Sequence, residues 1–110
     1  MLKYDLTIVQ GEDFAQDIYF KTNTNVYSLK GYTAKSQIRP KAGSDELTAE
    51  FVCTVYPNDG YIHMELDEQT ISNIPAGVYQ YDLLLTKTKE KTKAYYMGGK
   101  VYIEKHVTEP

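Results

Sequence analysis

The fold is decided by one stretch of the chain, Ile74-Pro75-Ala76-Gly77-Val78-Tyr79-Gln80-Tyr81-Asp82-Leu83-Leu84-Leu85-Thr86. Apolar side chains recur at every second position from 79 to 85, which predicts a half-buried β-strand. In immunoglobulin-like sandwiches, a tyrosine at the start of the penultimate strand folds back and donates a hydrogen bond to the preceding corner. We predict that Tyr79 is this corner residue and that Gly77 supplies the tight turn before it. The alternative is that Tyr79 is an ordinary half-buried strand aromatic.

Alternating runs of the same kind cover most of the remaining chain. Tyrosine, threonine, valine and isoleucine, which favour pleated and half-buried surfaces, dominate them. The runs span residues 2–10, 14–21, 32–39, 47–56, 61–67, 77–86 and 94–104, with a short extended segment at 26–29. They predict an all-β, immunoglobulin-like antiparallel β-sandwich of about seven strands. We expect one sandwich domain over residues 1–105 and a frayed tail over 106–110.

Turn chemistry separates these runs. Pro40 ends one of them because proline has no N–H to donate to a sheet, and the Asp59-Gly60 pair is a hairpin signal. Between residues 68 and 74 the apolar positions are three apart, which predicts one short helical turn. The Gly98-Gly99 pair in the last run predicts either a bulge or a close backbone approach. The polar segments 22–25 and 87–93 are predicted to be loops.

Composition excludes several classes of protein. The chain has 110 residues, a net charge of −3 and a single arginine, Arg39, against 11 lysines, so electrostatics give nucleic-acid binding little support. No apolar run approaches the roughly 20 residues of a membrane-spanning helix, and the first six residues show no secretory or transit pattern. One cysteine, Cys53, allows no internal disulfide and is typical of a protein made in a reducing cytoplasm.

The sequence lacks the residue patterns of an active site. It has no phosphate-binding loop, dinucleotide fingerprint or nucleophile elbow, and its two histidines, His63 and His106, lie on different elements. Alternation places Cys53 and His63 on opposite faces, which argues against a nucleophile–base pair. The carboxylates at 12–13 and at 65, 67 and 68 are interpreted as solvated turn acids, with a calcium site as the alternative. We therefore expect no enzyme activity, no metal and no cofactor.

Four segments, taken in order, resemble a family of small proteins and domains encoded by tailed bacteriophages and prophages. They are Gln10-Gly11-Glu12-Asp13-Phe14, Leu29-Lys30-Gly31-Tyr32-Thr33-Ala34-Lys35-Ser36-Gln37-Ile38-Arg39, the stretch from Ile74 to Thr86, and Gly98-Gly99-Lys100-Val101-Tyr102-Ile103. The resemblance covers nearly the whole chain. The chain is also similar, more loosely, to the N-terminal sandwich of phage upper baseplate proteins. In this chain we expect the domain to stand alone, without a coiled coil, fibre or lytic domain.

The resemblance implies an immunoglobulin-like virion component without enzymatic role, made in the host bacterial cytoplasm and present in several copies in the tail, baseplate, neck or capsid exterior. Its expected partners are other virion proteins, with weak self-association as a further expectation. Tyrosine is enriched in interfaces, so outward tyrosines are candidate contacts: Tyr56, Tyr61, Tyr96 and Tyr102. We predict an interface at Tyr96, Lys100 and Tyr102. The alternative function is a carbohydrate-binding module for host attachment, against which the absence of tryptophan argues.

Overall fold

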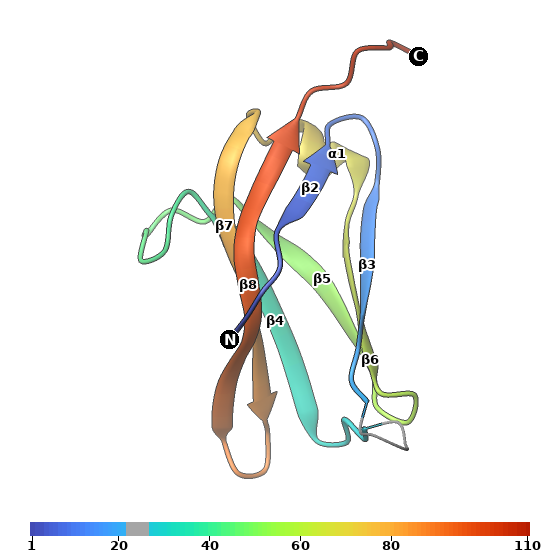
Figure 1. Ribbon diagram of the computed structural model, residues 1–110, viewed down its shortest axis with the longest axis vertical. Coiled ribbons are helices and arrows are strands. Elements are labelled where there is room, and N and C mark those ends of the chain that lie inside the picture. The colour runs from blue at the N-terminus through green and yellow to red at the C-terminus, as the bar shows by residue number, and fades with distance from the viewer. Residues whose placement is uncertain (22–26) are drawn as a thin grey trace.

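The computed structural model describes residues 1–21 and 27–110, and it is an all-β sandwich with one short helix (Figure 1). Its elements, in chain order, are β1 (Leu2–Lys3), β2 (Leu6–Val9), β3 (Phe14–Tyr19), β4 (Tyr32–Arg39), β5 (Ala49–Tyr56), β6 (Tyr61–Leu66), α1 (Glu68–Ser72), β7 (Gly77–Lys87) and β8 (Thr92–Glu104). The predicted all-β sandwich with one short helical turn is confirmed. The polar segment 22–25, predicted to be a loop, lies outside the described residues.

One strand connects the two layers of the sandwich. The hydrogen-bonded order is β1-β8-β7-β4-β5-β6-β3, with β2 also paired to β8. The first part of β5, residues 49–51, pairs with β4, whereas residues 52–56 pair with β6. β5 therefore leaves one sheet and joins the other, and the opposite side of the sandwich stays open between β2 and β3 (Figure 1).

The core lies between the layers and follows the predicted alternation. Ile38, Ile62, Leu83 and Val101, one from each of four strands, are all fully buried. Ser36 is the one buried polar residue of the described chain, and its hydroxyl donates a hydrogen bond to the carbonyl of Asp82. Because this hydroxyl has a hydrogen-bond partner, its burial leaves no polar group unpaired.

The first predicted strand is divided into two. β1 and β2 both run parallel to β8. Between them, the chain at Tyr4 and Asp5 crosses over Gly98 and Gly99 of β8. A Cβ on Gly99 would lie 2.5 Å from Asp5 Oδ1 and 2.8 Å from the Tyr4 carbonyl oxygen, so no side chain fits there. The backbone N–H of Lys100 donates to Asp5 Oδ1 at 2.8 Å. Of the two predictions for the glycine pair, the close backbone approach is the one that the structure confirms.

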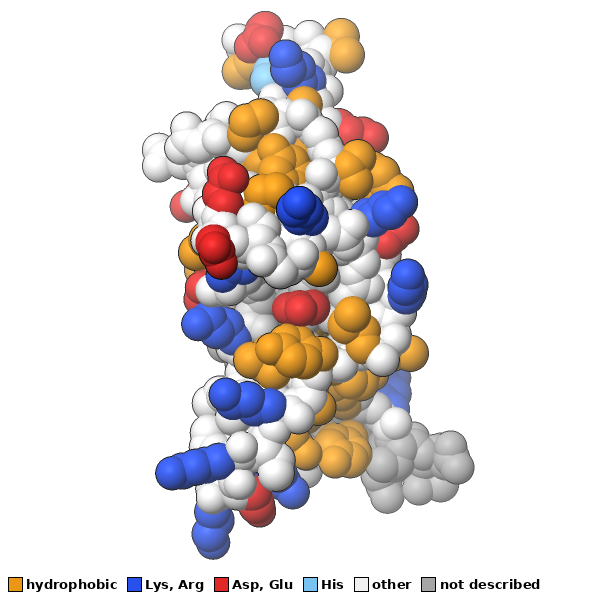
Figure 2. Space-filling view, turned by 90° about the vertical axis from the view of Figure 1, so that its left-hand side faces the viewer, with side chains coloured by type: hydrophobic (Ala, Val, Ile, Leu, Met, Phe, Trp, Pro, Cys, Tyr) orange, Lys and Arg blue, Asp and Glu red, His pale blue; other side chains and the backbone are white. Residues whose placement is uncertain are grey.

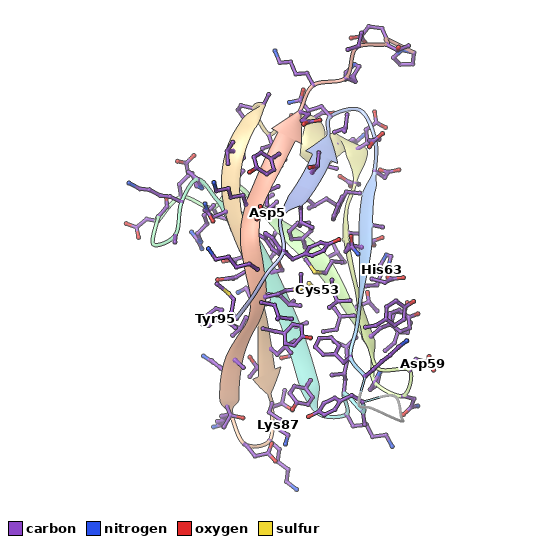
Figure 3. All side chains as sticks on the ribbon, viewed as in Figure 1. Asp5, Cys53, Asp59, His63, Lys87 and Tyr95 are labelled. Atoms are coloured by element: carbon purple, nitrogen blue, oxygen red, sulfur yellow. The ribbon has the colours of Figure 1, made fainter. Side chains whose placement is uncertain are left out.

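The hairpin of β7 and β8 does contain a β-bulge, but the bulge does not lie at the glycine pair. Leu83 of β7 is opposite Met97 and Leu84 is opposite Tyr95, so Tyr96 is the extra residue of a bulge. A bulge changes which residues face the core. Tyr95 consequently points outward (Figure 3), where the alternation alone predicted it to face inward. Tyr96 packs against the core.

The helical turn predicted at 68–74 is α1. Asp67 caps it by accepting a hydrogen bond from the N–H of Thr70 at 2.8 Å, and Asp13 accepts another from the N–H of Glu68 at 2.7 Å. These contacts give two of the turn carboxylates a structural role. Among the described residues, no helix is both long and apolar enough to cross a membrane. Residues 106–110 form no strand or helix and are exposed.

Candidate functional site

The corner predicted at Tyr79 is present in the structure. The Tyr79 hydroxyl donates a hydrogen bond of 2.7 Å to the carbonyl of Pro75, four residues upstream. Gly77 precedes the tyrosine, and a Cβ there would lie 3.8 Å from the Tyr79 ring. The bond holds the segment that crosses from β6 to β7. Tyr79 and Gly77 are therefore parts of the scaffold.

The residues predicted as an interface do not share one surface. Lys100 is exposed and Tyr102 is half-buried, and both point away from the core on the outer side of β8. Tyr96 points the other way, and its ring centroid lies 4.6 Å from that of Phe20. The prediction that Tyr96 faces outward is wrong because the bulge at this residue shifts the alternation.

Three other tyrosines do share a surface, on the outer face of the β3–β6–β5 sheet. Tyr19, Tyr61 and Tyr56 come from three adjacent strands, and we call them the tyrosine ladder. The centroids of Tyr56 and Tyr61 are 4.5 Å apart with the rings nearly parallel, and those of Tyr19 and Tyr61 are 5.1 Å apart. Tyr19 is 57% exposed and the nearby Val52 is 58% exposed. Tyr19 was not among the predicted contacts, although the alternation of its strand already points it outward.

Only Tyr19 and Tyr56, at the two ends of the ladder, keep a ring face that no other ladder ring covers. Tyr61 lies between the other two rings, so both of its faces are covered. The ammonium group of Lys21 lies 5.8 Å from the centroid of Tyr19. Stacking on a sugar needs a free aromatic face, whereas a flat protein surface can pack against tyrosine edges and hydroxyls. The arrangement thus suits contact with protein.

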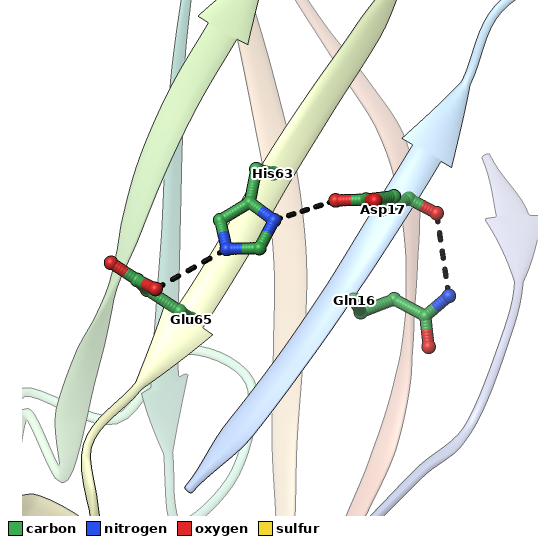
Figure 4. A network of polar contacts seen from close by, with 4 residues as sticks. All are labelled: Gln16, Asp17, His63 and Glu65. Atoms are coloured by element: carbon green, nitrogen blue, oxygen red, sulfur yellow. Dashed lines mark hydrogen bonds and ion pairs between the residues drawn. The ribbon is translucent and has the colours of Figure 1, made fainter.

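A polar cluster lies beside the ladder on the same face (Figure 4). His63 Nδ1 is 2.6 Å from Asp17 Oδ1, and His63 Nε2 is 3.2 Å from Glu65 Oε2. The hydrogen bonds to Asp17 and then to Glu65 raise the pKa of His63 above its ordinary value. Among the described residues, no group of three histidine, cysteine or acidic side chains is arranged to hold a metal ion.

Cys53 lies on the inner face of β5, away from His63 (Figure 3). Burial raises the pKa of its thiol to about 11, and the charge of Glu50 adds to this effect. A thiol with this pKa is almost entirely protonated at neutral pH and is therefore a poor nucleophile. The geometry agrees with the expectation that Cys53 and His63 form no catalytic pair.

A basic hollow of about 500 Å³ lies on the opposite sheet, over β4, β7 and the N-terminus. Four cationic side chains line it, and Asp82 is the one acid there: Lys3, Lys35, Arg39 and Lys41. Figure 2 shows this side of the molecule, with lysine and arginine side chains around apolar patches. Arg39 is held by hydrogen bonds to the Ser44 carbonyl at 3.1 Å and to Gln37 at 2.9 Å.

A comparison with protein-family models and with curated protein sequences finds no match for this chain.

Proposed function

We propose that this chain is a non-enzymatic structural or adaptor protein of a tailed-phage particle, in the tail or baseplate, the neck or the capsid exterior. The support is the ordered series of segments that resembles phage virion domains, together with an immunoglobulin-like sandwich. Under this proposal the chain is made in the bacterial cytoplasm and ends in the virion, bound to other virion proteins in several symmetric copies.

The observation that carries the proposal is the tyrosine ladder. A row of rigid aromatic side chains on a flat, exposed sheet face is the composition that protein interfaces favour. The ladder replaces Tyr96 as the proposed contact, while Lys100 and Tyr102 remain exposed enough for a second contact. Each contact is small, and repetition over many copies gives the assembly its stability.

The test is incorporation into particles. We expect the double variant Tyr19→Ser/Tyr56→Ser to fold but to be depleted from purified particles, as measured by mass spectrometry. The control is Tyr95→Ser, which removes an exposed tyrosine from the other sheet, outside both proposed contacts. Normal incorporation of the ladder variant would place the contact elsewhere, and a wild-type protein found only in the cytosol of infected cells would contradict the virion role.

Carbohydrate binding is the alternative, and the ladder weakens it. Tyr61 offers no free ring face, and the chain has no tryptophan. Saturable binding on a glycan array, abolished by Tyr56→Ser, would favour this alternative.

A further inference from the structure

β3 is the outermost strand of its sheet, and one side of it has no strand partner among the described residues. Its register with β6 is regular from Phe14 to Tyr19. The N–H of Phe20 donates to the Gly60 carbonyl at 2.8 Å, as in a hydrogen-bonded antiparallel pair, although the Gly60 N–H donates to the Tyr56 carbonyl instead. Because such pairs alternate along antiparallel strands, the backbone groups of residues 15, 17 and 19 point to the free edge.

A side-chain contact agrees with this assignment. The amide of Gln16 donates to the backbone carbonyl of Asp17 at 3.3 Å, and this carbonyl is one of those assigned to the free edge (Figure 4). The edge also lacks most of the features that usually prevent strand addition. β3 contains no proline, no lysine and no bulge, and its one charged residue is Asp17. The edge on the other side of the sandwich is short and broken at Tyr4 and Asp5.

An apolar hollow of about 340 Å³ opens beside the same edge. It lies between β3 and the N-terminal segment, and apolar side chains form most of its wall: Leu2, Tyr4, Ile18, Tyr96 and Met97. Leu2 is 59% exposed and Tyr4 is 47% exposed, and together they form an exposed apolar wall of this hollow. A strand added to β3 would direct every second side chain toward this hollow.

The charge on the outer face indicates the kind of strand that fits. Asp17 and Glu65 flank His63 there, so two carboxylates lie on this face next to the edge. The nearby lysines are Lys21, over the Tyr19 ring at the end of β3, and Lys3, in the wall of the hollow. A second copy of this chain would bring the same acids and a second net charge of −3. A segment with lysine or arginine on its outer side is complementary to this surface.

We propose that the free edge of β3 binds an extended segment of a partner protein as an additional strand, with apolar side chains in the hollow and basic side chains facing Asp17. This inference rests on the proposed function and names how the partner is held. Main-chain hydrogen bonds to residues 15, 17 and 19 supply affinity, and the hollow supplies specificity.

The test uses a synthetic peptide of alternating valine and lysine as the probe, followed by NMR of the folded protein. We expect saturable shifts of the Ala15, Asp17 and Tyr19 amides and at least tenfold slower hydrogen exchange at these positions. The control peptide has the same composition with its lysines grouped together. No saturable change at millimolar concentration, or equal binding of the control peptide, would overturn the proposal.

Two variants test the edge directly. Ala15→Pro removes an N–H that points to the free edge and should weaken peptide binding at least tenfold, whereas Ala15→Thr keeps the N–H and should bind normally. A third measurement, hydrogen exchange of the wild-type protein in purified particles, needs no variant. If the particles contain the protein but its amides at residues 15, 17 and 19 still exchange rapidly, this inference is contradicted and the proposed function is left intact. Concentration-dependent protection of these amides in the protein alone would overturn it in favour of a second copy.

Discussion

The side-chain amide of Gln10 donates a hydrogen bond of 2.7 Å to the carbonyl of Ile74, 64 positions further along the chain. It joins the first turn to the residues just after α1, and Asp13 of the same turn accepts a hydrogen bond from the N–H of Glu68 at the start of α1. The first turn and the segment that leads into β7 are therefore in contact, and the polar residues of the first turn serve the fold.

Gln10→Ala should reduce the free energy of unfolding by about 1 kcal/mol, because the Ile74 carbonyl loses its partner in a partly buried position. Chemical denaturation measures the change. Gln16→Ala is the control, since that amide makes only an exposed contact with a neighbouring residue. Equal denaturation midpoints for the two variants would contradict a role for Gln10 in joining these segments.

Tyr79→Phe should also cost about 1 kcal/mol, because it removes the donor to the Pro75 carbonyl while keeping the ring. Tyr61→Phe is the matched change in a tyrosine of the ladder and should cost clearly less. The comparison is made by urea denaturation of both variants. If the hydrogen bond from Tyr79 to the Pro75 carbonyl did not stabilise the fold, the two variants would be equally stable.

Alternation was enough to predict the inner faces of β4, β5, β6 and β7, because a period of two assigns each residue to one side. The same rule predicted that Tyr56 and Tyr61 point outward. The ladder itself was not predictable in this way, since the approach of Tyr19 to Tyr61 depends on the register between β3 and β6.

The alternation did not predict the bulge at Tyr96, and the reason lies in the neighbouring residue. Tyr95 and Tyr96 are the same residue type, so the sequence fits either phase of the alternation at this point. The break in the first strand has a distant cause. The Tyr81 hydroxyl donates to the Tyr4 carbonyl at 2.6 Å across 77 positions of sequence, and no local pattern records such a contact.

Gly99→Ala should destabilise the protein by roughly 1–3 kcal/mol, because the new Cβ would overlap Asp5 Oδ1 and the Tyr4 carbonyl. We expect faster hydrogen exchange in residues 2–6 as well, since the crossing segment has to move. Asp5→Ala is the control because it removes one hydrogen bond without adding an atom. An alanine variant with wild-type stability would show that the crossing segment adapts freely.

Cys53 should react with a thiol reagent at pH 8 about tenfold or more slowly in the folded protein than in denaturant. Its thiol has a pKa of about 11 in the folded protein, so very little thiolate is present. The rate is followed by absorbance, and the denatured chain serves as its own reference. Rapid modification of the native protein would mean that Cys53 faces solvent.

His63 should titrate above the ordinary histidine pKa of about 6.5, since hydrogen bonds to Asp17 and Glu65 favour its protonated form. A pKa that is higher in the folded than in the unfolded state stabilises the fold below pH 6.5, and this contribution disappears as the pH rises through the folded value. NMR titration of the imidazole should give a raised pKa in the wild type and a lower one in Asp17→Asn, where the nearer carboxylate is lost. Gln16→Ala, which alters the neighbouring side chain without touching the histidine, should leave the titration unchanged. Identical curves for the wild type and Asp17→Asn would show that the 2.6 Å contact does not persist in solution.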